Sequence, residues 1–151
     1  MSFLVAIDPG VHATGVAYFA GLRLQRVELV RAATLEGMLQ ALGNFHQTPS
    51  FYRKIVERPT VYARNAKGDP DDLIRVAIVA GAAALVHPGE IRFVEPRTWK
   101  GQVPKAIHNR RVLAALGEED NYDVSSVPAS LRHNMIDAVG LGLWHLGRLP
   151  R

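Results

Sequence analysis

The chain has 151 residues, with 18 lysines and arginines against 14 acids, a formal net charge of +4 and a pI near 9.8. This length predicts one domain spanning residues 1–151, with enough chain to bury a hydrophobic core. Because cysteine is absent, disulfides and thiolate metal sites are excluded, and oxygen or imidazole must hold any metal. The longest apolar run, 11 residues at 76–86, is too short for a membrane span, and no signal peptide is evident. We therefore expect a soluble cytoplasmic protein without a membrane partner.

The predicted elements alternate between strands and helices after an initial group of three strands. Short apolar or alternating segments predict strands at residues 4–7, 15–19 and 23–30, and then at 52–56 and 91–94. Helical spacing predicts helices at 35–42, from 71 or 72 to 86, at 104–116 and at 131–146, with loops at 58–70 and 117–129. The order βββαβαβαα predicts an α/β fold with a five-stranded mixed sheet flanked by helices. The first three strands should be antiparallel, and the later two should run parallel to the first.

Three acids occupy positions that this topology would bring together. Asp8 ends the first strand and Glu57 ends the fourth, so neighbouring parallel strands would place their carboxylates about 4.8 Å apart at one sheet edge. Asp137 lies in the last helix, and Asn134 shares its helical face at a spacing of three residues. Gly140 is in the same region, and we expect its missing side chain to let this helix approach the sheet closely.

Carboxylates gathered in this way favour a site for hard divalent cations. They repel one another unless a counterion neutralises them, and all-oxygen ligation suits Mg²⁺, with Mn²⁺ as a substitute. Two ions about 3.5–4 Å apart can activate water and stabilise the leaving oxygen of a phosphodiester. Each acid alone has an ordinary alternative: a turn for Asp8, a surface salt bridge for Glu57 and a solvated helix position for Asp137. Their combination in this order favours the metal site.

The segments that carry these acids resemble those of a known family, the RuvC-like Holliday junction resolvases. Residues 6–17, AIDPGVHATGVA, resemble the family's first-strand signature, while 55–57 and 137–142 resemble its second acidic strand and its terminal acidic helix. Residues 94–105 are similar to a segment of compact phage-type members. The resemblance implies an RNase H-like (integrase-like) fold and a protein of a bacterial or phage-infected cell. It also implies two Mg²⁺ ions per site, with catalytic and metal-ligating roles for Asp8, Glu57, Asn134 and Asp137.

The fourth of these positions departs from the family pattern. Many members carry Asp or His where this chain has Asn134, and an amide oxygen brings no charge, so we expect weaker binding of the second ion. His133 is adjacent and lies four residues before Asp137; it is an alternative ligand or general base, or else a phosphate contact or surface histidine.

A basic segment suggests how the acids would approach a polyanion. Between residues 92 and 111 there are six basic residues and one acid, which favours a phosphate-binding stripe over a merely solvated surface. The resemblance places Lys100 and Lys105 near catalytically important basic residues, and Tyr62 in a loop that stacks on bases at the junction centre. Tyr62 packed on its own loop is the alternative, Trp99 is either a second stacking residue or a buried anchor, and His12 is a further candidate contact. The predicted DNA-binding set is Tyr62, Arg64, Lys67, Arg97, Lys100, Lys105, Arg110 and Arg111.

The function that follows from the resemblance is resolution of four-way DNA junctions by paired symmetric nicks. Two symmetric cuts imply a homodimer, and the Ala-rich helix at 72–86 is the candidate interface because Ala80, Gly81 and residues 82–84 permit close approach, although packing on its own sheet explains them equally. An RNase H-like nuclease acting on other branched DNA or RNA and a binding-only junction protein remain alternatives. A nucleotide-binding protein of the actin or sugar-kinase type is disfavoured because a second glycine-rich phosphate turn is absent, so no nucleotide cofactor is expected.

Overall fold

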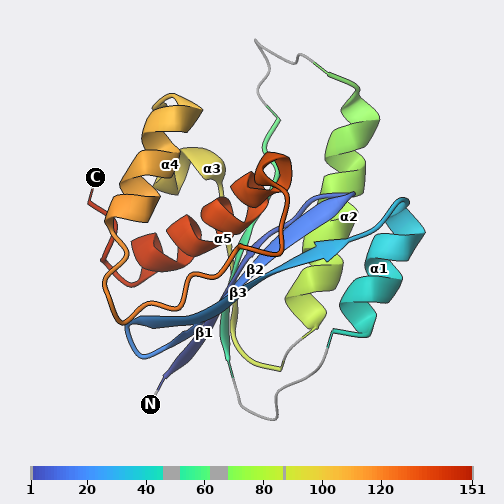
Figure 1. Ribbon diagram of the computed structural model, residues 1–151. Helices are drawn as coiled ribbons and strands as arrows, with labels where there is room; N and C mark the ends of the chain where they lie inside the picture. Colours follow the sequence, from blue (N-terminus) through green and yellow to red (C-terminus); the bar gives the residue numbers. More distant parts are fainter. Residues whose placement is uncertain (1, 46–51, 62–67, 87, 151) are drawn as a thin grey trace.

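The computed structural model describes residues 2–45, 52–61, 68–86 and 88–150, and it contains a mixed five-stranded sheet with the strand order β3-β2-β1-β4-β5 (Figure 1). The strands are β1 (Phe3–Asp8), β2 (Ala13–Ala20), β3 (Arg23–Arg31), β4 (Arg53–Glu57) and β5 (Ile91–Val94). The helices are α1 (Leu35–Gly43), α2 (Pro70–Leu85), α3 (Pro96–Trp99), α4 (Lys105–Ala114) and α5 (Arg132–His145), with a 3₁₀ turn at Ala129–Leu131.

The strand directions agree with the prediction from sequence. β1 pairs antiparallel with β2, and β2 pairs antiparallel with β3. The strands that follow helical connections, β4 and β5, run parallel to β1 and to each other. The register places Ile7 of β1 beside Val56 of β4, and Asp8 beside Gly15 of β2. The carboxyl ends of β1 and β4 therefore meet at the middle of one sheet edge.

Helices cover both faces of the sheet, and each face has its own hydrophobic core. On one face α5 crosses the strands, with α3 and α4 packed beyond it; on the other lie α1 and α2 (Figure 1). Neighbouring residues on β4 serve the two cores alternately: Ile55 faces α5 and Val56 faces α2. This alternation follows from the two-residue period of a strand. Along the described parts of the chain, no helix has the length and hydrophobicity needed to cross a membrane.

The structure adds two short elements and begins helix α2 earlier than predicted. Neither the four-residue helix α3 nor the 3₁₀ turn before α5 was predicted. Helix α2 begins at Pro70, earlier than residue 71 or 72, because the Asp69 side chain caps it by accepting a hydrogen bond from the backbone N–H of Asp71. Proline suits this first position because its missing N–H would be unpaired there in any case.

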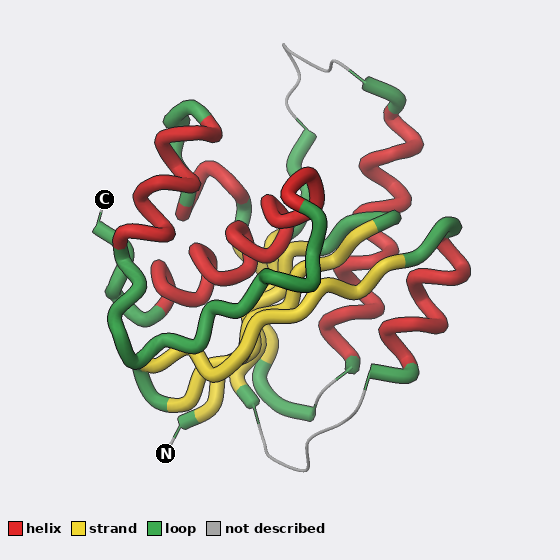
Figure 2. The backbone as a smooth tube through the Cα atoms, in the orientation of Figure 1, coloured by secondary structure: helices red, strands yellow, loops and turns green. Residues whose placement is uncertain are grey.

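A long connection between α4 and α5 runs along the edge strand β3 (Figure 2). Asn121, in this connection, makes two hydrogen bonds to β3. Its backbone N–H donates to the backbone oxygen of Leu24 and its side chain donates to that of Gln25, each over 2.9 Å. Asp120 anchors the connection by accepting from the backbone N–H groups of Leu24 and Gly117, at 2.8 Å each. These contacts cover part of an edge that would otherwise expose unpaired backbone groups.

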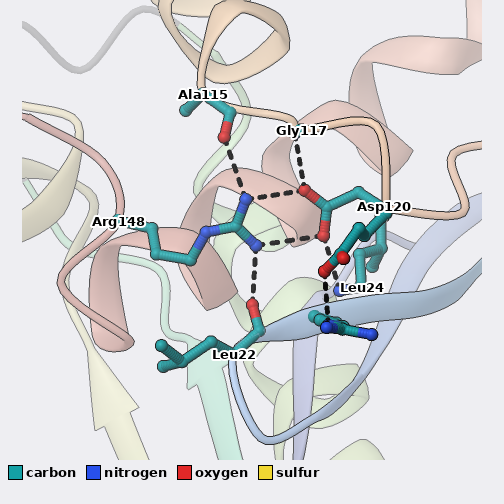
Figure 3. A network of polar contacts seen from close by, with 8 residues as sticks. Leu22, Leu24, Ala115, Gly117, Asp120 and Arg148 are labelled. Carbon is teal, nitrogen blue, oxygen red and sulfur yellow. Dashed lines mark hydrogen bonds and ion pairs between the residues drawn. The ribbon is translucent and has the colours of Figure 1, made fainter.

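The Arg148 guanidinium joins this connection to the end of the chain (Figure 3). Its two terminal nitrogens donate to the two carboxylate oxygens of Asp120 over 3.0 and 2.6 Å, and they also donate to the backbone oxygens of Leu22 and Ala115. This paired geometry holds the pKa of Asp120 at about 2, chiefly through the hydrogen bond from Arg148. The segment after α5 is thus tied to the β2–β3 turn and to the end of α4.

Candidate active site

The last residues of β1 and β4 place two acids side by side. Asp8 ends β1 and Glu57 ends β4, and the register pairs the residues just before them, Ile7 and Val56. Both carboxylates therefore leave the sheet at the same edge. Asp8 is only 7% exposed, and its carboxylate receives no hydrogen bond or ion pair from the part of the chain that the structure describes. A buried acid without a direct partner is costly for folding, so this position is a candidate for a functional role.

Helix α5 brings Asp137 to this edge, and a glycine in the sheet makes the approach possible. Gly15 pairs with Asp8 across β1 and β2. A Cβ atom at Gly15 would lie 2.0 Å from the backbone oxygen of Asn134, so any side chain there would push the first turn of α5 off the sheet. Asn134 is half-buried in that turn, on the face it shares with Asp137.

The expectation for Gly140 was wrong, because this residue faces the neighbouring helices instead of the sheet. A Cβ atom at Gly140 would lie 2.7 Å from Val112 on α4 and 2.9 Å from the ring of Trp99 on α3. The glycine that meets the sheet from within α5 is Gly142, where a Cβ atom would clash with the ring of Phe19 at 2.2 Å. Gly140 therefore creates the space in which Trp99 packs beside Asp137.

The Lys100 ammonium lies between two of the acids. Its Nζ atom is 3.1 Å from Glu57 Oε2 and 3.0 Å from Asp137 Oδ2. Two aromatic side chains, from α3 and α4, contact the same carboxylates. Trp99 Nε1 donates to Glu57 Oε2 over 2.8 Å, and His108 Nε2 lies 3.2 Å from Asp137 Oδ1. The site thus joins residues from β1, β4, α3, α4 and α5 and the segment after α3.

The electrostatics of the three acids reflect burial and mutual repulsion. Burial, together with the negative charges of Glu57 and Asp137, raises the pKa of Asp8 well above its ordinary value. Burial also raises the pKa of Glu57, although Lys100 and the Trp99 N–H oppose it. For Asp137, burial is outweighed by the contacts with His108 and Lys100, so its pKa is lowered. The acids of this cluster are close together, poorly solvated and only partly neutralised, which is an arrangement that favours a cation.

The donor set fits a divalent cation, although Lys100 holds the central position. Among the described residues, acids and histidines form no ready-made group of three metal ligands. Glu57 and Asp137 instead share one ammonium, and Asp8 has only longer-range neutralisation from Lys100 and Lys105. Carboxylate oxygens are the ligands that Mg²⁺ and Mn²⁺ prefer, and an uncompensated buried acid beside them supplies the remaining negative charge.

The predicted basic stripe divides into residues with different surroundings. A pocket of about 270 Å³ opens beside Asp137 and is lined by Lys100, Lys105 and His108, among others. Arg97, Lys105 and Arg110 are exposed on α3 and α4, whereas Arg111 donates to the backbone oxygen of Pro150 and so serves the end of the chain. Three predicted DNA contacts, Tyr62, Arg64 and Lys67, lie outside the described residues.

The histidines near the predicted site have different surroundings. His133 contacts the backbone oxygen of Ser130, and His12 contacts that of Ala32, both in exposed settings. His108 was not singled out from sequence, yet it is the histidine beside Asp137 and is only 4% exposed. The sequence pattern provided little indication that His108 is buried, because it occurs within a strongly basic helix, where a polar residue is expected to be solvated. Of the two alternatives for Trp99, the structure supports the buried anchor, since the ring is 6% exposed.

Comparison with known proteins gives agreement in structure only. No family model and no curated protein matches the sequence. In structure, Thermus thermophilus RuvC in complex with a Holliday junction substrate matches with a TM-score of 0.55 and 20% identity, over 96% of this chain and 92% of that one. The fowlpox virus Holliday junction resolvase matches with a TM-score of 0.59 and 11% identity, over 97% and 99%. The yeast mitochondrial resolvase matches with a TM-score of 0.53 and 11% identity, over 98% and 82%. The chain therefore has the fold of the RuvC-like Holliday junction resolvases, which is an RNase H-like fold.

Proposed function

We propose that this protein is a Holliday junction resolvase, an endonuclease that nicks four-way DNA junctions in a reaction dependent on Mg²⁺ or Mn²⁺. The observation that carries the proposal is the meeting of Asp8, Glu57 and Asp137, from three separate elements, at one edge of a RuvC-like sheet. The comparison proteins are Holliday junction resolvases by name, which supports this substrate class.

The residues that would hold the cations are Asp8, Glu57 and Asp137, with the Asn134 amide as a neutral fourth ligand. Two bound ions would activate water and neutralise charge on the leaving oxygen of the phosphodiester. Asp8 contributes a buried carboxylate whose charge is otherwise largely uncompensated. Asn134 lies one helical turn from Asp137, and no described residue hydrogen-bonds its side chain.

Lys100 has two roles in this proposal. In the structure its ammonium partly neutralises Glu57 and Asp137, which otherwise repel each other at this edge. When cations bind, the ammonium has to leave the carboxylates, and the pocket that it lines with Lys105 gives it space to do so. There it would contact a backbone phosphate of the substrate, as would the exposed Arg97 on α3 and the exposed Lys105 and Arg110 on α4.

A homodimer would place two such sites for symmetric cleavage, and the structure changes which residues of α2 would form its interface. Ala80, Ala83 and Ala84 pack in the chain's own core. The exposed face carries an apolar stripe at helical spacing: Ile74 is 58% exposed, Ile78 44% and Leu85 78%, with the exposed Gly81 between them. Apolar side chains gathered on one helix face in this way are typical of a surface that another subunit covers.

The direct test is cleavage of a mobile four-way junction in the presence of Mg²⁺ or Mn²⁺, beside a matched linear duplex and an RNA–DNA hybrid. We expect paired symmetric nicks in the junction alone, and no cleavage by the Asp8→Asn variant. Equal cleavage of all three substrates would favour an RNase H-like nuclease of broader specificity. Tight junction binding without cleavage by the wild type would favour a binding-only protein.

A further inference from the structure

We propose that Trp99 and His108 form a positioning pair that holds the carboxylates of Glu57 and Asp137 in the orientation required for divalent cations. The inference rests on the proposed function, because the pair acts on the metal site assigned above. Both residues lie outside the acidic cluster itself, on α3 and α4, and both are buried.

Trp99 controls one oxygen of Glu57. Indole nitrogen has a single N–H, and it is directed to Glu57 Oε2 over 2.8 Å. With the ring 6% exposed, the side chain is not available to stack on a DNA base. Its polar atom therefore serves Glu57 alone, and both oxygens of this carboxylate also face the ammonium, since Lys100 Nζ is 3.1 Å from Oε2 and 3.3 Å from Oε1.

His108 lies beside Asp137 at contact distance, although the direction of its Nε2 atom does not complete a hydrogen bond. Its Nε2 atom lies 3.2 Å from Asp137 Oδ1, while Asp137 Oδ2 faces Lys100 at 3.0 Å. Asp137 thus has one oxygen beside His108 and the other directed toward the ammonium, whereas both oxygens of Glu57 face the ammonium and Oε2 also accepts from Trp99. A carboxylate oxygen that faces the Lys100 ammonium in the structure would also face a divalent cation that takes the place of this ammonium.

The two aromatic rings support each other. Their centroids are 5.0 Å apart with an interplanar angle of 71°, an edge-to-face contact. Gly140 lets the Trp99 ring press against α5, three residues along the helix from Asp137. A displacement of either ring would therefore move the partner ring, and with it the orientation of both carboxylates. Residues that orient metal ligands in this way typically change metal affinity about 10- to 100-fold when they are replaced.

The test is Mn²⁺ binding by the full chain without DNA, measured by calorimetry and by Mn²⁺ electron paramagnetic resonance. Trp99→Phe and His108→Phe keep an aromatic ring but remove the indole N–H and the imidazole nitrogens, and we expect each to weaken Mn²⁺ binding about 10- to 100-fold. His108→Gln can place an amide N–H near the original Nε2 position, and it should restore most of the affinity. Val112→Ala is the matched control, because it loosens the same packing without a polar contact and should leave Mn²⁺ affinity nearly unchanged.

The outcomes separate this inference from the proposed function. Wild-type binding of Mn²⁺ that is lost in Asp8→Asn, together with unchanged affinity in folded Trp99→Phe and His108→Phe, would overturn only the positioning pair. An equal loss in Val112→Ala would also overturn it, because general loosening would then explain the effect. Absence of Mn²⁺ binding by the wild type would instead overturn the proposed metal site itself.

Discussion

Asp8 is unfavourable for folding, and the proposed function makes the same residue necessary for chemistry. It is buried beside two other acids without a direct partner, and burial and repulsion raise its pKa. A raised pKa means that the folded state binds this proton more tightly than the unfolded chain does. The charged form therefore destabilises the protein at neutral pH, and this penalty disappears as the pH falls through the raised pKa.

We predict that Asp8→Asn raises the melting temperature at pH 7 by about 2–4 °C, which corresponds to roughly 1 kcal/mol for a chain of this size. The variant should lose junction cleavage while it retains junction binding. Differential scanning calorimetry without added metal, at pH 7 and at pH 5, measures the first effect. The increase in melting temperature should be larger at pH 7 than at pH 5. A variant that melts at a lower temperature than the wild type at both pH values would contradict this prediction.

Lys100 is the second residue whose removal should have opposite effects on two measurements. Its ammonium contacts Glu57 and Asp137, and in the proposed metal site it would compete with cations for them. We predict that Lys100→Met binds Mn²⁺ about tenfold more tightly, equivalent to about 1.4 kcal/mol, yet cleaves junctions more slowly. Arg110→Met, which removes an exposed charge on α4, should weaken junction binding without this gain. Weaker Mn²⁺ binding by Lys100→Met would show that the ammonium assists the metal site.

At the scale of elements, the strands were easier to predict than the contacts between helices. The positions of Asp8 and Glu57 followed from strand ends and from the parallel direction of β1 and β4, which depend on local sequence and on connection rules. The role of Gly140 was misassigned because it depends on how α3 and α4 pack on α5. His108 was overlooked for the same reason: its burial arises from tertiary packing, whereas its own helix is strongly basic.

The connection between α4 and α5 allows an element-scale prediction. Removing Asp120 leaves the Arg148 guanidinium without its paired acceptor and leaves two backbone N–H groups unpaired. We predict that Asp120→Ala lowers the free energy of unfolding by about 3–5 kcal/mol at pH 7, measured by urea denaturation. Glu119→Ala removes an exposed ion pair with Arg23 close by and should cost less than about 1 kcal/mol.

The difference in the free energy of unfolding between the wild type and Asp120→Ala should depend on pH, because the pKa of Asp120 is lowered. The folded-state pKa is about 2 against an ordinary 3.8, so the carboxylate contributes about 2 kcal/mol of stability above pH 4. This contribution is lost as the pH falls from about 4 to 2. The difference in free energy of unfolding between the wild type and Asp120→Ala should therefore decrease over that pH range. A constant difference would mean that the hydrogen bonds of Asp120 stabilise the protein equally without its charge.

For the whole molecule, the exposed apolar face of α2 leads to a prediction about assembly. We predict that Ile78→Glu is monomeric in light scattering at concentrations where the wild type is dimeric. It should keep its Mn²⁺ affinity but make single, uncoupled nicks in junctions. Leu22→Glu places the same charge at another exposed apolar position, on the β2–β3 turn, and should remain dimeric. A dimeric Ile78→Glu would place the interface elsewhere on the molecule.

Gly15 is a position at which this protein does not tolerate another amino acid. Every amino acid other than glycine adds an atom where the Asn134 carbonyl already sits, so no conservative replacement exists at this position. A saturation library screened for cleavage would return the parental residue alone, even though position 15 has no reactive group. A residue without a reactive group, beside the acidic cluster, is thus as strictly specified as the acids themselves.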